Sequence, residues 1–172
     1  MSSRVLISFF SDDRPGVIHE ISRAIEDHGG SWMDSQLSRL GGRFAGVLQA
    51  QVPAAQQEAL DASLSALVDR GITATLTSAG EAPAGAATTR GLRVLGPDRR
   101  GIVQEMTRAL QDAGFNVLSL ATSVETAPMS GEPLFRAEAR IEVLEASRID
   151  ELEAQLDALA EAMTLEIDLS PS

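Results

Sequence analysis

Apolar residues recur with helical spacing in four segments of the chain. The first and third segments share the spacing i, i+1, i+4, i+7 and i+8, formed by Val17, Ile18, Ile21, Ala24 and Ile25 and by Ile102, Val103, Met106, Ala109 and Leu110. The second and fourth segments have apolar positions about one turn apart, at Leu60, Leu64, Leu67 and Val68 and at Ile149, Leu152, Leu156 and Leu159. Each stripe predicts an amphipathic helix with one buried face.

The ends of these helices also have sequence signals. Gly29, Gly71 and Gly114 follow the first three stripes, at the place where a helix commonly ends in a left-handed residue. Ser147 together with Asp150 approximates a capping box, which predicts the start of the fourth helix.

Four residue runs in each half of the chain predict strands. They are 5–10, 32–38, 44–52 and 72–76, followed by 92–95, 117–125, 134–143 and 165–169. The short turn at 39–43 predicts an antiparallel hairpin. Alternation is strictest in the run 134–143, where the apolar positions are Phe135, Ala137, Ala139, Ile141 and Val143 and the positions between them are charged. We therefore expect helices on one face of each sheet and a polar opposite face.

The two halves are copies of one unit. Residues 13–29 align without gaps to residues 98–114, an offset of 85. Identical pairs are Asp13/Asp98, Arg14/Arg99, Gly16/Gly101, Glu20/Glu105, Arg23/Arg108, Ala24/Ala109, Asp27/Asp112 and Gly29/Gly114. The element order is βαββαβ twice, which predicts an α+β protein of two ferredoxin-like units, each an antiparallel sheet with helices on one face. We expect domains at 1–79 and 91–172 and a linker at 80–90.

Composition excludes several classes of function. The 172 residues include 14 Lys+Arg, all of them Arg, and 25 Asp+Glu, for a net charge of −11. An acidic chain without basic clusters argues against direct nucleic-acid binding and against an anionic membrane surface. Aromatic residues make up 3%, too few to favour an RNA-recognition sheet. No apolar run has the length of a signal peptide or membrane span, so we expect a cytoplasmic protein.

Cysteine and histidine content bears on catalysis and on metals. The absence of cysteine excludes disulfides, thiolate catalysis and Cys-ligated zinc or iron–sulfur clusters. The histidines, His19 and His28, lack metal-ligand spacing, and helix-surface or helix-end packing is the expected role for both. We predict no metal and no cofactor. The single tryptophan, Trp32, is expected at an interface or in a core.

The loop between the first strand and first helix is duplicated as well. It reads Ser11-Asp-Asp-Arg-Pro-Gly16 and Gly96-Pro-Asp-Arg-Arg-Gly101. Such a loop leads to a helix N-terminus, where unpaired amides and the helix dipole favour a carboxylate. The glycines let a ligand approach the backbone. The aspartates would cap the helix or face a ligand ammonium, and the arginines would hold a carboxylate or form solvated ion pairs.

These motifs resemble the ligand loop of the ACT-domain family, small-molecule sensing modules that commonly bind amino acids. The family's polar residue at the opening of the second strand is matched by Asn116, whose counterpart is Ser31. The resemblance implies a ligand between one domain's loop and its neighbour's second strand. On that arrangement the first loop would meet Asn116, the second loop would meet Ser31, and the two sites would differ.

Two ACT units without an attached enzyme resemble the glycine cleavage system transcriptional repressor type. This implies a non-catalytic homodimer that binds an amino acid such as glycine and controls a partner protein, with regulation of glycine cleavage or amino-acid metabolism genes as the expected process and no direct contact with nucleic acid. The ligand-binding candidates are Asp12, Asp13, Arg14, Gly16, Ser31, Asp98, Arg99, Gly101 and Asn116. The alternatives are a ligand-independent assembly module and, with the least support, an enzyme.

Overall fold

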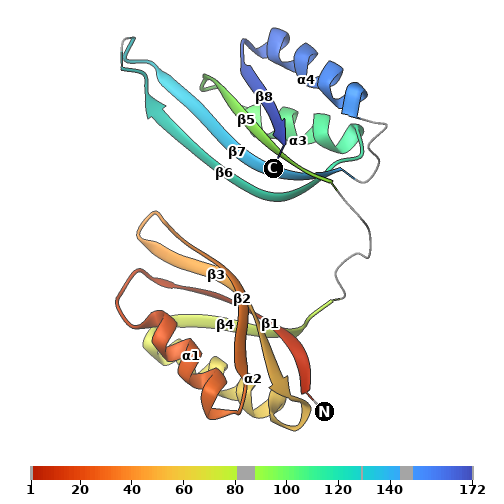
Figure 1. Ribbon diagram of the computed structural model, residues 1–172. Helices are drawn as coiled ribbons and strands as arrows, with labels where there is room; N and C mark the ends of the chain where they lie inside the picture. Colours follow the sequence, from red (N-terminus) through yellow and green to blue (C-terminus); the bar gives the residue numbers. More distant parts are fainter. Residues whose placement is uncertain (1, 81–87, 129, 144–148, 172) are drawn as a thin grey trace. The chain divides into compact units, whose positions relative to one another are not determined.

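The computed structural model describes residues 2–80, 88–128, 130–143 and 149–171. The chain divides into two compact units, residues 1–82 (unit 1) and 83–172 (unit 2) (Figure 1). Strand β5 begins at Thr88, inside the predicted linker 80–90, and residues 81–87 of that linker lie outside the described residues. The domain limits proposed from the sequence therefore stay a prediction.

Unit 1 is a four-stranded antiparallel sheet with its helices on one face (Figure 1). Its elements are β1 (Ser2–Asp12), α1 (Val17–Asp27), β2 (Ser31–Leu40), β3 (Arg43–Pro53), η1 (Ala54–Gln56), α2 (Gln57–Ala66), η2 (Leu67–Arg70) and β4 (Ile72–Ser78). The strand order is β2-β3-β1-β4, so β1 lies between β3 and β4.

Unit 2 repeats this arrangement. Its elements are β5 (Thr88–Pro97), α3 (Ile102–Asp112), β6 (Asn116–Thr126), β7 (Pro133–Val143), α4 (Ile149–Met163) and β8 (Glu166–Pro171), with the strand order β6-β7-β5-β8. The predicted α+β fold of two ferredoxin-like units is confirmed. Each unit has its own hydrophobic core between the sheet and the helices.

Most residues of the predicted helix stripes lie in the cores or are partly buried, with three exceptions. Ile18 and Val103, the second residue of their stripes, are exposed because each lies about 100° around the helix from its buried neighbour. Val68 is 58% exposed. It lies in the 3-10 helix η2, where three residues complete a turn, so its spacing from Leu64 no longer places it on the buried face.

The face assignments are confirmed for β7, where Phe135, Ala137, Ala139 and Ile141 are buried. The side chain of Val143 and the capping residue Ser147 lie outside the described residues. The open face of unit 1 is not wholly polar, because it exposes Phe10 and Val47.

The predicted left-handed helix ends are confirmed, since φ is positive at Gly29, Gly71 and Gly114. Thr164 makes the turn before β8 with φ 55°. No helix in the described ranges has both the length and the hydropathy needed to cross a membrane.

Candidate functional site

The repeated loops have the same backbone geometry. Gly16 occupies the N-cap position of α1 with φ 96°, and Gly101 occupies that of α3 with φ 88°. The amide of Glu20 donates to the Gly16 carbonyl at 2.9 Å, and the amide of Glu105 donates to the Gly101 carbonyl at the same distance. A positive φ at these positions favours glycine over any residue with a Cβ.

The aspartates of the loops do not cap the helices. Neither helix receives a hydrogen bond from an N-cap side chain, because the N-cap residue is the glycine three positions further on. The Asp13 carboxylate instead pairs with Arg39 of β2 at 3.2 Å. The backbone amides of Asp13 and Asp98 extend the sheet, donating to the carbonyls of Gly42 at 3.2 Å and Pro133 at 3.0 Å. The capping interpretation is therefore wrong for both aspartates.

Arg14 contacts a carboxylate and a backbone carbonyl beyond its own loop. Its Nη1 lies 2.7 Å from Oε1 of Glu20, and its Nη2 donates to the carbonyl of Arg70 at 2.9 Å. Arg70 also reaches the same carboxylate, with Nη1 3.4 Å from Oε2 of Glu20. The side chain of Glu20 is 16% exposed. A partly buried carboxylate thus bridges the loop and the end of η2.

This network shifts the ionisation of both partners. The hydrogen bond from Arg14 lowers the pKa of Glu20 below its ordinary value, against a smaller opposing effect of burial, and Arg70 adds to the lowering. The same hydrogen bond raises the pKa of Arg14. The charged forms of both groups are therefore favoured in the folded unit.

The second loop contains a simpler version of this pair. Nη2 of Arg99 lies 3.0 Å from Oε2 of Glu105. The sequence leaves two roles open for Arg14 and Arg99, binding of a ligand carboxylate and formation of an ion pair. The contacts in both units agree with the ion pair. Sequence reasoning missed Glu20 and Glu105 as members of the loops. The available signal was their identity at matching positions in the repeat, six residues after each arginine.

Asp12 differs from the other loop candidates. It forms an ion pair with Arg43, whose guanidinium carbon lies 5.7 Å from the centre of the Phe10 ring. The equivalent position in unit 2 is Pro97, so this contact is not part of the repeat. Trp32 is partly buried against the core of unit 1.

Ser31 and Asn116 open β2 and β6. The Asn116 amide donates to Glu142 Oε2 at 3.3 Å. Ser31 pairs with Gln51, which pairs with Arg4, eight residues before the end of β1 at Asp12. At about 3.3 Å per residue, Ser31 is roughly 26 Å along the sheet from the loop of its own unit.

The same distance separates Asn116 from the second loop. Asn116 pairs with Glu142, which pairs with Thr89, eight residues before the end of β5 at Pro97. Neither unit by itself therefore brings the loop and the polar residue of the second strand together.

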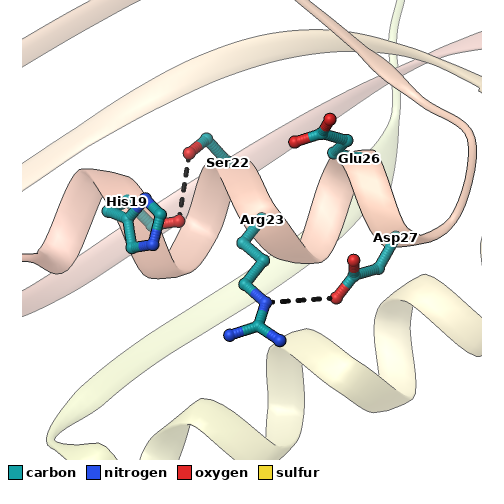
Figure 2. A pocket seen from close by; sticks show the side chains of 5 residues that line it. All are labelled: His19, Ser22, Arg23, Glu26 and Asp27. Carbon is teal, nitrogen blue, oxygen red and sulfur yellow. Dashed lines mark hydrogen bonds and ion pairs between the residues drawn. The ribbon is translucent and has the colours of Figure 1, made fainter.

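The outer face of α1 bears an open hollow of about 420 Å³ (Figure 2). It is lined by His19, Ser22, Arg23, Glu26 and Asp27, all from one helix. The Ser22 hydroxyl donates to the His19 carbonyl at 3.0 Å, and Arg23 pairs with Asp27 at 3.6 Å. These contacts are local to the helix.

A second hollow of about 540 Å³ lies between α1 and α2 and includes Glu20 and Arg70 in its lining. His28 is also in its lining, with Nδ1 2.7 Å from the Ala24 carbonyl and Nε2 3.3 Å from the Ser63 hydroxyl. His28 is thus packed at the helix end, as expected. Within the described ranges, no three His, Asp or Glu side chains are grouped as metal ligands.

Comparison with known proteins identifies the fold type. The family model of the ACT domain matches residues 3–77. A solved structure described as an unknown protein from Galdieria sulphuraria covers 100% of this chain with 99% of its own, at 26% identity and a TM-score of 0.89. No curated protein matches the chain.

A second solved structure, described as a candidate glycine cleavage system transcriptional repressor, covers 99% of this chain with 97% of its own, at 19% identity and a TM-score of 0.74. At that identity the likeness shows a shared fold. Together with the repeated topology and the repeated loops, these matches show that the chain is built of two ACT-like units, the first of which matches the ACT-domain family model.

Proposed function

We propose that this protein is a non-catalytic regulator that binds a small amino acid, such as glycine, at its loops and transmits occupancy to a partner protein. The observation that carries the proposal is the duplicated loop, with Gly16 and Gly101 in the same left-handed conformation at the start of a helix. Asp, Arg and Glu around this glycine are repeated as well.

The chemistry around each loop suits a zwitterion. Amides at the start of a helix have no partner within the helix, and together with the helix dipole they favour a carboxylate. A guanidinium beside them, Arg14 or Arg99, adds a fork-shaped donor for a carboxylate. The negatively charged carboxylates of Asp13 and Asp98 can accept hydrogen bonds from a ligand ammonium.

A second ACT unit would complete each site. Ser31 and Asn116 are remote from the loop of their own unit, so on this proposal they serve the loop of another unit, in the same chain or in a second copy. The amide of Asn116 offers both donors and an acceptor. Ligand binding would then favour one association of units over another, to the extent that the ligand has higher affinity for it.

We propose that the protein is a cytoplasmic homodimer. The process that it regulates would be the expression of genes for glycine cleavage or amino-acid metabolism. A net charge of −11 favours an effect on transcription through a protein partner rather than through direct contact with DNA.

Thermal melting in the presence of amino acids tests this proposal. Glycine at a hundredfold excess over its dissociation constant should stabilise the protein by about 2.7 kcal/mol. Glycinamide, which lacks the carboxylate, should stabilise it less. His19→Gln is a control variant that should keep the full stabilisation by glycine, because unit 2 has Gln104 at the equivalent position and His19 lies outside the loop. A panel of amino acids without any shift in the melting temperature would contradict the proposal.

Ligand-independent assembly is the second candidate function. Edge strands β2 and β6 expose Met33 and Leu118, which occupy equivalent positions in the repeat. Exposed apolar residues on an edge strand favour pairing with another chain. Light scattering with and without amino acids measures the mass of the assembly, and the melting experiment above measures binding. A dimer whose mass does not change with amino acids, together with no shift in melting temperature, would favour assembly alone.

A further inference from the structure

The arginines of the two loops, Arg14 and Arg99, are held by different numbers of partners. Arg14 contacts the Glu20 carboxylate at 2.7 Å and the Arg70 carbonyl at 2.9 Å, and Arg70 contacts the same carboxylate at 3.4 Å. Among the described residues, the ion pair of Arg99 is the one with Glu105 at 3.0 Å. The same Asp-Arg-x-Gly motif thus has different surroundings in the two loops.

The cause of this difference is the residue at the end of the second helix. Phe10 pairs with Thr73 in unit 1, and the equivalent Leu95 pairs with Glu166 in unit 2. Three residues earlier, the equivalent positions are therefore Arg70 and Met163. Met163 is 5% exposed and belongs to the core of unit 2, so this position provides no second guanidinium near Glu105.

The glutamates that pair with the two arginines also differ in solvent exposure. The side chain of Glu20 is 16% exposed, whereas that of Glu105 is 47% exposed. An exposed ion pair exchanges its partners with water and ions at little cost. The carboxylate of Glu20 is partly buried and is also held in place by Arg70, so it releases Arg14 less readily. To reach a ligand, Arg14 would have to break two short contacts, and Arg99 would have to break one exposed contact.

We propose that Arg70 is a positioning residue that retains Arg14 on Glu20, and that Arg99 is consequently the arginine that binds the carboxylate of a ligand. We call the contacts among Arg14, Glu20 and Arg70 the clamp. The inference rests on the proposed function for the identity of the ligand, but the clamp and the response to a carboxylate are measurable without an amino acid. The two loops would then have different roles despite their identical Asp-Arg-x-Gly motifs.

NMR of the arginine Nε–H groups, with sodium acetate as the carboxylate probe, tests the inference. Signals are assigned from their loss in Arg14→Met and Arg99→Met. In the unmodified protein we expect acetate to shift the Arg99 signal and leave the Arg14 signal in place. Arg70→Met reproduces the residue of unit 2: it keeps the backbone carbonyl that Arg14 contacts but removes the guanidinium that holds Glu20 in place, and in this variant both signals should shift. Arg108→Met, an exposed arginine of α3 outside the loop, is the matched control.

A second variant protects the test against loss of folding. Glu20→Gln breaks the clamp from its other side, and it should also make Arg14 respond to acetate. Loss of Arg99 should weaken acetate binding about tenfold. An equal response of Arg14 and Arg99 in the unmodified protein, or an unresponsive Arg14 in both clamp variants, would overturn the inference. Failure of glycine to bind while these acetate responses hold would instead contradict the proposed function.

Discussion

Nη1 of Arg14 lies 2.7 Å from Oε1 of Glu20, and the repeat carries the same pair as Arg99 and Glu105. The carboxylate of each pair lies beside the N-cap glycine. A Cβ placed on Gly16 would be 3.8 Å from Oε1 of Glu20, and one on Gly101 would be 3.7 Å from Oε1 of Glu105. Each loop is therefore closed by a glutamate from the first turns of the following helix.

Substitution of the two glutamates should have unequal effects on stability. Glu20→Gln should lower the free energy of unfolding by about 1 kcal/mol, because it removes a partly buried charged acceptor shared by Arg14 and Arg70. Glu105→Gln should lower it by at most about 0.5 kcal/mol, because its pair with Arg99 is exposed. Urea unfolding followed by circular dichroism measures both. A larger loss for Glu105→Gln would contradict this assignment.

Acid should reduce the contribution of Glu20. Its pKa in the folded protein is below the ordinary value of 4.5, so the stabilisation is complete above that value and is lost as pH falls through the lower, folded-state pKa. The difference in unfolding free energy between the unmodified protein and Glu20→Gln should therefore shrink as the pH is lowered below 4.5. A difference that stays constant from neutral to acidic pH would be inconsistent with the Arg14 hydrogen bond.

Adding a Cβ at the loop glycines should introduce backbone strain. Gly16 and Gly101 have φ of 96° and 88°, so Gly16→Ala and Gly101→Ala should each destabilise the protein by about 1 kcal/mol or more. The surroundings leave room for the methyl group, so the strain is in the backbone. Gly80→Ala is the control, since no atom lies within 4 Å of a Cβ at that glycine and its φ is outside the strained range. Thermal melts that rank Gly80→Ala with the loop variants would contradict the prediction.

Exchange of the residues that open the second strands tests the proposed pairing of sites. Asn116→Ser should weaken glycine binding about tenfold through the loss of an amide hydrogen bond, and Ser31→Asn should strengthen binding at the other site. Calorimetry of the two variants and of the double exchange gives the affinities and the number of sites. Unchanged binding in all three would show that β2 and β6 do not contribute to a ligand site.

The fold could be predicted from the sequence because its signals are periodic and occur twice. The stripes of α1 and α3, the terminal glycines and the alternation along β7 each specify local structure. α-Helical spacing places Val68 on the buried face, but this residue lies in η2, which is a 3-10 helix, and it is exposed. Ile18 adjoins a buried residue in the sequence, but on the helix it lies beside the buried stripe and is exposed.

The site was less predictable, because its contacts join residues that a motif does not connect. Asp13 has the residue type of a helix cap, but the chain continues for three residues before α1 begins, and its carboxylate meets Arg39 of β2 instead. The bridge from Arg14 to Arg70 spans 56 positions of the chain. Such a contact depends on how η2 ends beside the loop, which the local sequence patterns do not specify.

Isothermal titration calorimetry of the full chain with glycine tests the central claim most directly. The account predicts saturable binding to the unmodified protein, a dissociation constant about tenfold higher in Arg99→Met, and little change in the control Arg108→Met. The absence of heat of binding with glycine and with every other amino acid tried, at concentrations where the protein is folded, would contradict the claim that these loops form an amino-acid sensor.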